Sequence, residues 1–505
     1  MGARCHWKTF LAVVCWRRLT VPPLEVATLK RLVPWLAASL LVTFSAPAVA
    51  NPSADPAYLL KDIARRGGSG PHQLTHVGDL TFFVANDDDH GRELWKTDGT
   101  SAGTVMVKDI RLGPRSSYPG RLTAVGDLLF FRAETQRYGY ELWKSDGTTP
   151  GTTLVKDINP GPHSSMTGAL ASWGQTEALG DTLIFRASDG RAGYELWRSD
   201  GTEPGTTLIK DIWPGRHESF PNTLTTFGDD VFFGAADPEH GEELWKTDGT
   251  TEGTVLVEDI NPGAERSAPI RLTPVGDRLF FAASDGLHGW EPWTTDGTEA
   301  GTRLVLDINK GIDPSVDSWP PGPWAALGDV LLFYADDGWR GQELWRTDGT
   351  QVGTTILADL APGAKGSGPE ELTVVNETLA YLFTWAGKGF WRTDGTEQGT
   401  ERLGRIGGTG IYSGPNLRDF FAVGETLFFQ SAKPDVGYEL WMSDGTVEGT
   451  GLAADICPGP NPSVPRGLSA IGTTLLFAAT DCEHGRELWA FPVTEAASDL
   501  GSMQE

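Results

Sequence analysis

The 505-residue chain carries 67 acidic residues against 41 basic ones, a formal net charge of −26. An acidic surface of this kind repels nucleic acids and anionic membranes, so we exclude both as partners. The 63 glycines and 33 prolines are spread throughout the chain and interrupt every candidate long helix, which favours an all-β fold.

The first 50 residues are organised like a secretory signal peptide. Lys30 and Arg31 precede an apolar stretch at 32–44, and the sequence ending in Ala50 suits signal peptidase. The apolar stretch is shorter than the roughly 20 residues of a membrane span, so we expect no membrane insertion. Residues 1–25 fit no signal peptide, and we interpret them as an extension from a mis-assigned start. We therefore predict a secreted or periplasmic protein, with the cell surface as the alternative location. It has a folded domain at 51–492 and a tail at 493–505.

One motif, Glu-Leu-Trp-x-x-Asp-Gly-Thr, returns about every 48 residues, and a fixed period of that length indicates a repeat architecture. Its tryptophans are Trp95, Trp143, Trp197, Trp245, Trp293, Trp345, Trp391, Trp441 and Trp489. A residue that occurs in every unit serves the structure of the unit, so function is to be sought where the units differ.

The second unit illustrates the predicted elements. Short strands are expected at 122–125, 128–133, 140–144 and 153–158, separated by Gly/Asp turns and a glycine-containing loop. Four short strands in about 48 residues match one blade of a β-propeller. The Gly-Asp and Asp-Gly-Thr turns then lie on one face, which we call the turn face. The loop after the second strand and the connection between blades lie on the other, the loop face.

The two ends of the repeat region complement each other. Residues 58–63 read as a fourth strand without the first three, and 486–490 read as a third strand without its fourth. Pairing them closes a ring and leaves no open sheet edge. We therefore predict a propeller of nine four-stranded blades, in which the N-terminal strand completes the last blade. A solenoid of stacked repeats is the alternative, although it would need capping units.

The repeated motif resembles the ELWxxDGT repeat family, also described as hyalin-like repeats, over residues 58–490. The resemblance implies an exported bacterial repeat protein without a well-defined activity. It carries over no catalytic residues.

Two carboxylates recur at a fixed spacing of 16 residues, the glutamate of the third strand and the aspartate of the fourth, and the seventh unit lacks both. The pairs include Glu93 and Asp109, Glu141 and Asp157, Glu195 and Asp211, and Glu243 and Asp259. A hairpin would bring the two close together, and facing carboxylates repel each other unless a partner neutralises them. The partner is either a set of backbone N–H groups, a basic side chain of a neighbouring blade, or a Ca²⁺ ion held by hard oxygen ligands.

Two connections between blades are lengthened, and both carry tryptophans. One contains Trp173, and the other contains Trp319 and Trp324, with Trp290 bordering the second in sequence. Aromatic side chains on exposed loops are common recognition elements, so these four are candidate binding residues, with packing over the blade edges as the alternative.

Two cysteines follow residue 50, Cys457 and Cys482, and both fall on the loop face of the last units. In an exported protein they predict one disulfide.

These features favour an exported, monomeric, non-enzymatic scaffold that binds a protein or polysaccharide. A Ca²⁺-stabilised extracellular matrix module and a propeller-type glycan hydrolase or lyase are the alternatives. No Ser/His/Asp arrangement, Cys/His pair or phosphate loop stands out in the sequence.

Overall fold

The computed structural model describes residues 57–166, 175–316, 323–386, 389–405 and 419–493. By its internal contacts the chain divides into Met1–Ser53 and Ala54–Glu505. The predicted signal peptide lies outside the described residues, as does all of the predicted tail after Val493. Among the described residues, no helix is long and apolar enough to cross a membrane.

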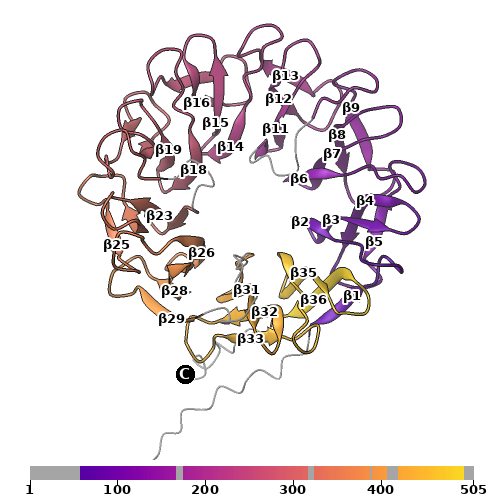
Figure 1. Ribbon diagram of the computed structural model, residues 1–505. Helices are drawn as coiled ribbons and strands as arrows, with labels where there is room; N and C mark the ends of the chain where they lie inside the picture. Colours follow the sequence, from indigo (N-terminus) through magenta and orange to yellow (C-terminus); the bar gives the residue numbers. More distant parts are fainter. Residues whose placement is uncertain (1–56, 167–174, 317–322, 387–388, 406–418, 494–505) are drawn as a thin grey trace, which may run out of the picture. The chain divides into compact units, whose positions relative to one another are not determined.

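Nine four-stranded antiparallel sheets form a ring, and the described residues contain no α-helix (Figure 1). The first four blades are β2 (His72–Val77), β3 (Leu80–Asp87), β4 (Gly91–Thr97), β5 (Val105–Lys108); β6 (Gly120–Val125), β7 (Leu128–Ala133), β8 (Glu141–Ser145), β9 (Thr153–Lys156); β10 (Thr176–Leu179), β11 (Thr182–Ala187), β12 (Glu195–Ser199), β13 (Thr207–Lys210); and β14 (Asn222–Phe227), β15 (Asp230–Asp237), β16 (Gly241–Thr247), β17 (Val255–Glu258).

The fifth to eighth blades are β18 (Ile270–Val275), β19 (Arg278–Ala283), β20 (Glu291–Thr295), β21 (Arg303–Leu304); β22 (Ala325–Leu327), β23 (Val330–Asp336), β24 (Gln342–Thr347), β25 (Thr355–Ala358); β26 (Pro369–Asn376), β27 (Leu379–Thr384), β28 (Gly389–Thr393), β29 (Glu401–Arg405); and β30 (Phe421–Val423), β31 (Thr426–Lys433), β32 (Gly437–Ser443), β33 (Gly451–Ala454). The ninth combines β34 (Arg466–Ile471), β35 (Thr474–Thr480), β36 (Arg486–Pro492) and the N-terminal β1 (Tyr58–Lys61).

The ring closes as the sequence predicts. Strand β1 pairs antiparallel with β36, with Tyr58 opposite Ala490. The innermost strands β2 and β34 of the first and ninth blades also contact each other. The nine-bladed propeller is therefore confirmed, and the solenoid alternative is wrong.

The core lies between blades. The second strand of each blade is buried on both of its faces because a neighbouring blade covers each one, as the burial of Phe130 and Phe131 illustrates. Trp143 packs against Phe82 and Leu94 of the preceding blade. A tryptophan that buries 150–250 Å² contributes about 4–6 kcal/mol of transfer free energy. The recurrent tryptophan is therefore a blade-to-blade packing residue.

The Asp-Gly-Thr turn docks on the preceding blade. Asp146 Oδ1 accepts hydrogen bonds from Thr148 N at 2.8 Å and Thr148 Oγ1 at 2.7 Å. Gly147 has φ +85°, and a Cβ there would lie 2.9 Å from the Leu80 side chain of the preceding blade. Glycine is therefore needed both for the backbone conformation and for the close approach.

Leu60 tests the ring closure, because it is the buried anchor of β1 in the cluster between the ninth and first blades. We expect Leu60→Ala to lower the free energy of unfolding by about 2–5 kcal/mol, as for other buried leucines. Urea unfolding followed by tryptophan fluorescence measures the change. Tyr58→Ala is the matched control, because Tyr58 lies on the same strand but is 44% exposed. Equal, small effects of both variants would mean that β1 does not complete the last blade.

Candidate functional site on the loop face

The glutamate of the motif is enclosed by hydrogen-bond donors. Glu141 is fully buried. It accepts bonds from Ile158 N at 2.9 Å, Ser165 N at 2.9 Å and Ser165 Oγ at 2.6 Å. All three donors belong to the connection that leads to the next blade. The same set of bonds surrounds Glu93, Glu195, Glu243, Glu291 and Glu439. Of the partners that the sequence allows, the structure gives this glutamate backbone N–H groups and a serine hydroxyl.

The paired aspartate is only half satisfied. Asp157 Oδ2 accepts a bond from Gly161 N at 3.1 Å, whereas its Oδ1 is buried without a hydrogen-bond partner. Asp109, Asp211 and Asp259 make the same single bond, and their Oδ1 atoms, like that of Asp307, are buried without a hydrogen-bond partner. Within the described ranges, no three His, Cys, Asp or Glu side chains gather as a metal site would require. A Ca²⁺ ion at these pairs therefore stays a prediction.

Burial changes the acidity of the glutamates. It raises the pKa of Glu93, Glu141, Glu195, Glu243, Glu291 and Glu439 from 4.5 to about 7, against the lowering effect of their hydrogen bonds. A carboxyl buried in this way binds its proton more tightly in the folded chain than in the unfolded one.

The four candidate tryptophans divide into two groups. Trp173 and Trp319 lie outside the described residues. Trp290 and Trp324 are partly buried and pack against one cluster between the fifth and sixth blades. The rings of Trp324 and Phe333 are 5.6 Å apart, and Trp290 Nε1 donates to Ala268 O at 3.5 Å. These two tryptophans therefore share one cluster, and both take part in the packing between the blade edges.

More exposed apolar side chains lie beside them. Leu287, Ile312 and Trp339 are 70%, 78% and 83% exposed, and we call them the apolar patch. Their backbones adjoin, because a Cβ on Gly289 would lie 2.8 Å from Ile312 O and one on Gly338 would lie 2.8 Å from Asn309 Oδ1. The sequence analysis missed this patch. Its only signal was the placement of large apolar residues in loops where other units carry small or polar ones.

A recurrent contact links each connection to the loop of the following blade. Asn159, Asn261 and Asn309 face Gly190, Gly286 and Gly338, each glycine so close that a Cβ would lie 2.8 Å from the amide oxygen. At the equivalent positions Cys457 and Cys482 form a disulfide, with their Cα atoms 5.7 Å apart. In the fourth blade the equivalent residues are Trp213 and Pro238.

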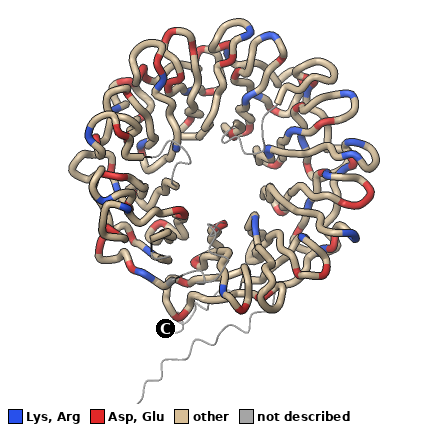
Figure 2. Tube along the Cα trace, in the orientation of Figure 1, with Lys and Arg blue, Asp and Glu red and all other residues tan. Residues whose placement is uncertain are grey.

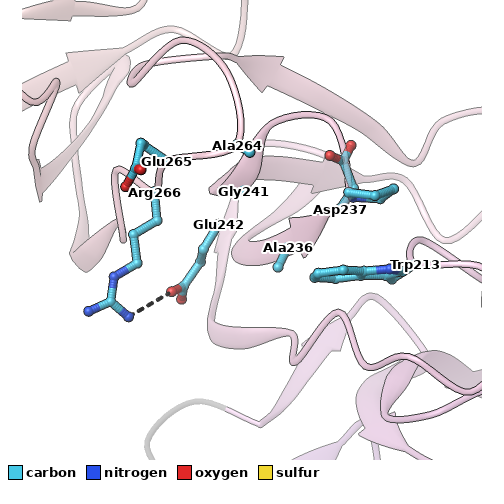
Figure 3. A pocket seen from close by; sticks show the side chains of 9 residues that line it. Trp213, Ala236, Asp237, Gly241, Glu242, Ala264, Glu265 and Arg266 are labelled. Atoms are coloured by element: carbon cyan, nitrogen blue, oxygen red, sulfur yellow. Dashed lines mark ion pairs between the residues drawn. The ribbon is translucent and has the colours of Figure 1, made fainter.

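Trp213 lines a pocket of about 440 Å³ on the loop face (Figure 3). The pocket lies between the connection that carries Trp213, the loop at Ala236 and Asp237, and the following connection at Arg266. The charged side chains of the molecule are otherwise distributed around the whole ring, on every blade (Figure 2).

Comparisons with known proteins do not assign this chain to a family. No protein family matches it. No curated protein matches it either. Among solved structures, the computationally designed Ika8 protein is 14% identical with a TM-score of 0.42, and the alignment covers 86% of this chain and 99% of Ika8.

Two other solved structures are peptidases or hydrolases. The S511A mutant of puromycin hydrolase complexed with PGG is 15% identical with a TM-score of 0.38, over 72% of this chain and 58% of the hydrolase. A prolyl endopeptidase is 9% identical with a TM-score of 0.39, over 73% of this chain and 55% of the endopeptidase. This chain therefore spans little more than half of either enzyme, and at these scores the likeness supports no conclusion about activity.

The buried glutamates predict a pH dependence of stability. The pKa of these glutamates is about 7 in the folded chain, whereas its ordinary value is 4.5. Their contribution to the free energy of unfolding is therefore complete below about pH 4.5 and is lost as the pH rises through 7. We expect Tm, measured by calorimetry, to fall between pH 5.5 and pH 8. Glu141→Gln removes one titration and should make the fall shallower. A Tm that rises over this interval would contradict the prediction.

Proposed function

We propose that this protein is an exported, non-enzymatic propeller that binds a protein partner through the apolar patch, and that it serves as a scaffold outside the cytoplasm. The observation that carries the proposal is the clustering of Leu287, Ile312 and Trp339 on adjoining segments of the loop face. Contiguous exposed apolar side chains on a water-soluble fold are typical of protein–protein contact sites. A polysaccharide is the other class of partner that the sequence allows.

Three further features support this proposal. The Asp-Gly-Thr turns of the first eight blades make the same internal hydrogen bonds, so the turn face offers little that distinguishes these blades from one another. The disulfide suits an oxidising compartment. The signal-peptide pattern and the resemblance to ELWxxDGT repeat proteins agree with export.

The apolar patch can be tested by substitution. Trp339→Ala combined with Ile312→Ser should weaken capture of a protein partner from the extracellular fraction by roughly 30-fold, the effect of losing about 2 kcal/mol at an interface centre. Surface plasmon resonance with the captured partner measures the loss. Val352→Ser is the control, because Val352 is 91% exposed on the turn face. Equal binding by both variants, or capture of polysaccharide alone, would contradict a protein-binding patch.

A Ca²⁺-stabilised matrix module is the second candidate, and the buried Oδ1 atoms of Asp109, Asp157, Asp211 and Asp259 favour it. Against it, the neighbouring glutamates already accept three hydrogen bonds each, as at Glu141. We expect excess EDTA to leave Tm unchanged. A Tm that falls with EDTA and recovers with Ca²⁺, but not with Mg²⁺, would favour the second candidate instead.

A further inference from the structure

Trp213 stands where three other connections carry an asparagine. At the equivalent position Asn159, Asn261 and Asn309 lie against a glycine of the next loop. The Asn–Gly contact joins the connection to the loop of the next blade with a small side chain. An indole at this position adds apolar surface that the fold does not require elsewhere in the described ring.

The surface added by Trp213 faces a hollow. The pocket, at about 440 Å³, falls within the range of roughly 300–1,000 Å³ that is typical of ligand sites. In Figure 3 Trp213 lies on one side of Ala236, and Glu242 and Arg266 lie on the other. The imidazole of His217 stacks on the indole with ring centroids 5.5 Å apart, which fixes the orientation of Trp213.

Three of the charged side chains that line the pocket, Asp237, Glu242 and Arg266, take part in ion pairs. His240 Nδ1 lies 2.8 Å from Asp237 Oδ2, and Arg266 Nη1 lies 4.0 Å from Glu242 Oε2. Asn222 Nδ2 also donates to Glu242 Oε1 at 2.9 Å, which holds that carboxylate in place. The pocket thus offers an apolar wall, one carboxylate acceptor and one guanidinium donor, with Glu265 as its remaining charge.

We propose that this pocket binds one ring of a neutral saccharide, which packs against Trp213 and hydrogen-bonds to Glu242 and Arg266. A sugar ring has C–H groups that suit an aromatic wall and hydroxyl groups that both donate and accept hydrogen bonds. Glu242, which Asn222 holds, and Arg266 place an acceptor and a donor side by side, which matches adjacent hydroxyls. The site is separate from the apolar patch and does not depend on the function proposed for it.

A cationic ligand is the alternative occupant of the same pocket, because Asp237, Glu242 and Glu265 line it against Arg266. Trp213 and the carboxylates could attract an amine. However, Asp237 is bonded to His240 and Glu242 is paired with Arg266, whose positive charge would repel a second cation. A hydroxyl-rich neutral ligand meets no such repulsion.

Isothermal titration calorimetry of the full chain with maltose, cellobiose, lactose and chitobiose tests the proposal. We expect at least one disaccharide to bind with a Kd of about 1 mM, a magnitude typical of a single sugar ring held by few contacts. Trp213→Asn should weaken that binding by roughly 10-fold or more. This variant should fold, because asparagine occupies the equivalent position in three other connections. Glu242→Ala should weaken the binding as well.

Trp339→Ala is the matched control, because it removes an exposed tryptophan of the same face without touching the pocket. It should bind the disaccharide as the wild type does, whatever its effect on a protein partner. The proposal is overturned if none of the four disaccharides binds, if Trp213→Asn binds as tightly as the wild type, or if lysine amide binds and the sugars do not. None of these results bears on the apolar patch, which the variants of Trp339 and Ile312 test separately.

Discussion

In every described blade but the seventh, a buried carboxylate fixes the connection that leads to the next blade. The glutamate of the third strand accepts bonds from the start and the end of the following connection, as Glu141 does from Ile158 and Ser165. Backbone N–H groups buried without a partner would each cost about 1–3 kcal/mol, so one carboxylate offsets several such penalties at once. The path of the connection, and with it the whole loop face, depends on this side chain.

The seventh blade shows what replaces the glutamate when it is missing. Gly389 takes its position, and a Cβ there would lie 2.8 Å from Thr384 Oγ1. The indole of Trp391 occupies the space and donates to Thr384 Oγ1 at 3.2 Å. Trp391 still packs against the cluster between the sixth and seventh blades, and it gains a hydrogen bond inside its own blade.

The architecture could be predicted from the sequence because it rests on local signals that recur. The period, the turns and the complementary ends at β1 and β36 together specify nine closed blades. The partner of the buried glutamate could only be narrowed to a few classes, because Ser165 and Ile158 come close through a connection whose path no local pattern encodes. The apolar patch and the Trp213 pocket were missed for the same reason. Each combines segments of adjacent units, and a single tryptophan in a loop does not reveal what lies beside it.

The innermost strands of the blades differ in how regularly they pair with the second strand. In six blades the first strand begins with a register shift. In four of them a non-glycine residue has a positive φ there: Gln73, Arg121, Thr223 and Arg271. Such a conformation costs roughly 1–3 kcal/mol and persists only where the surroundings impose it.

Strands β10, β22 and β30 pair with their neighbours without a register shift, and each is short. They follow the connections that contain residues 167–174, 317–322 and 406–418, which lie outside the described part. Each short connection enters its blade through a bulge, which is strained at a non-glycine residue in four of the six, whereas the three longer ones lead to a regular strand. A longer connection thus avoids the strained bulge. Insertions into the connections between blades therefore cost the fold little, and the loop face can vary from blade to blade.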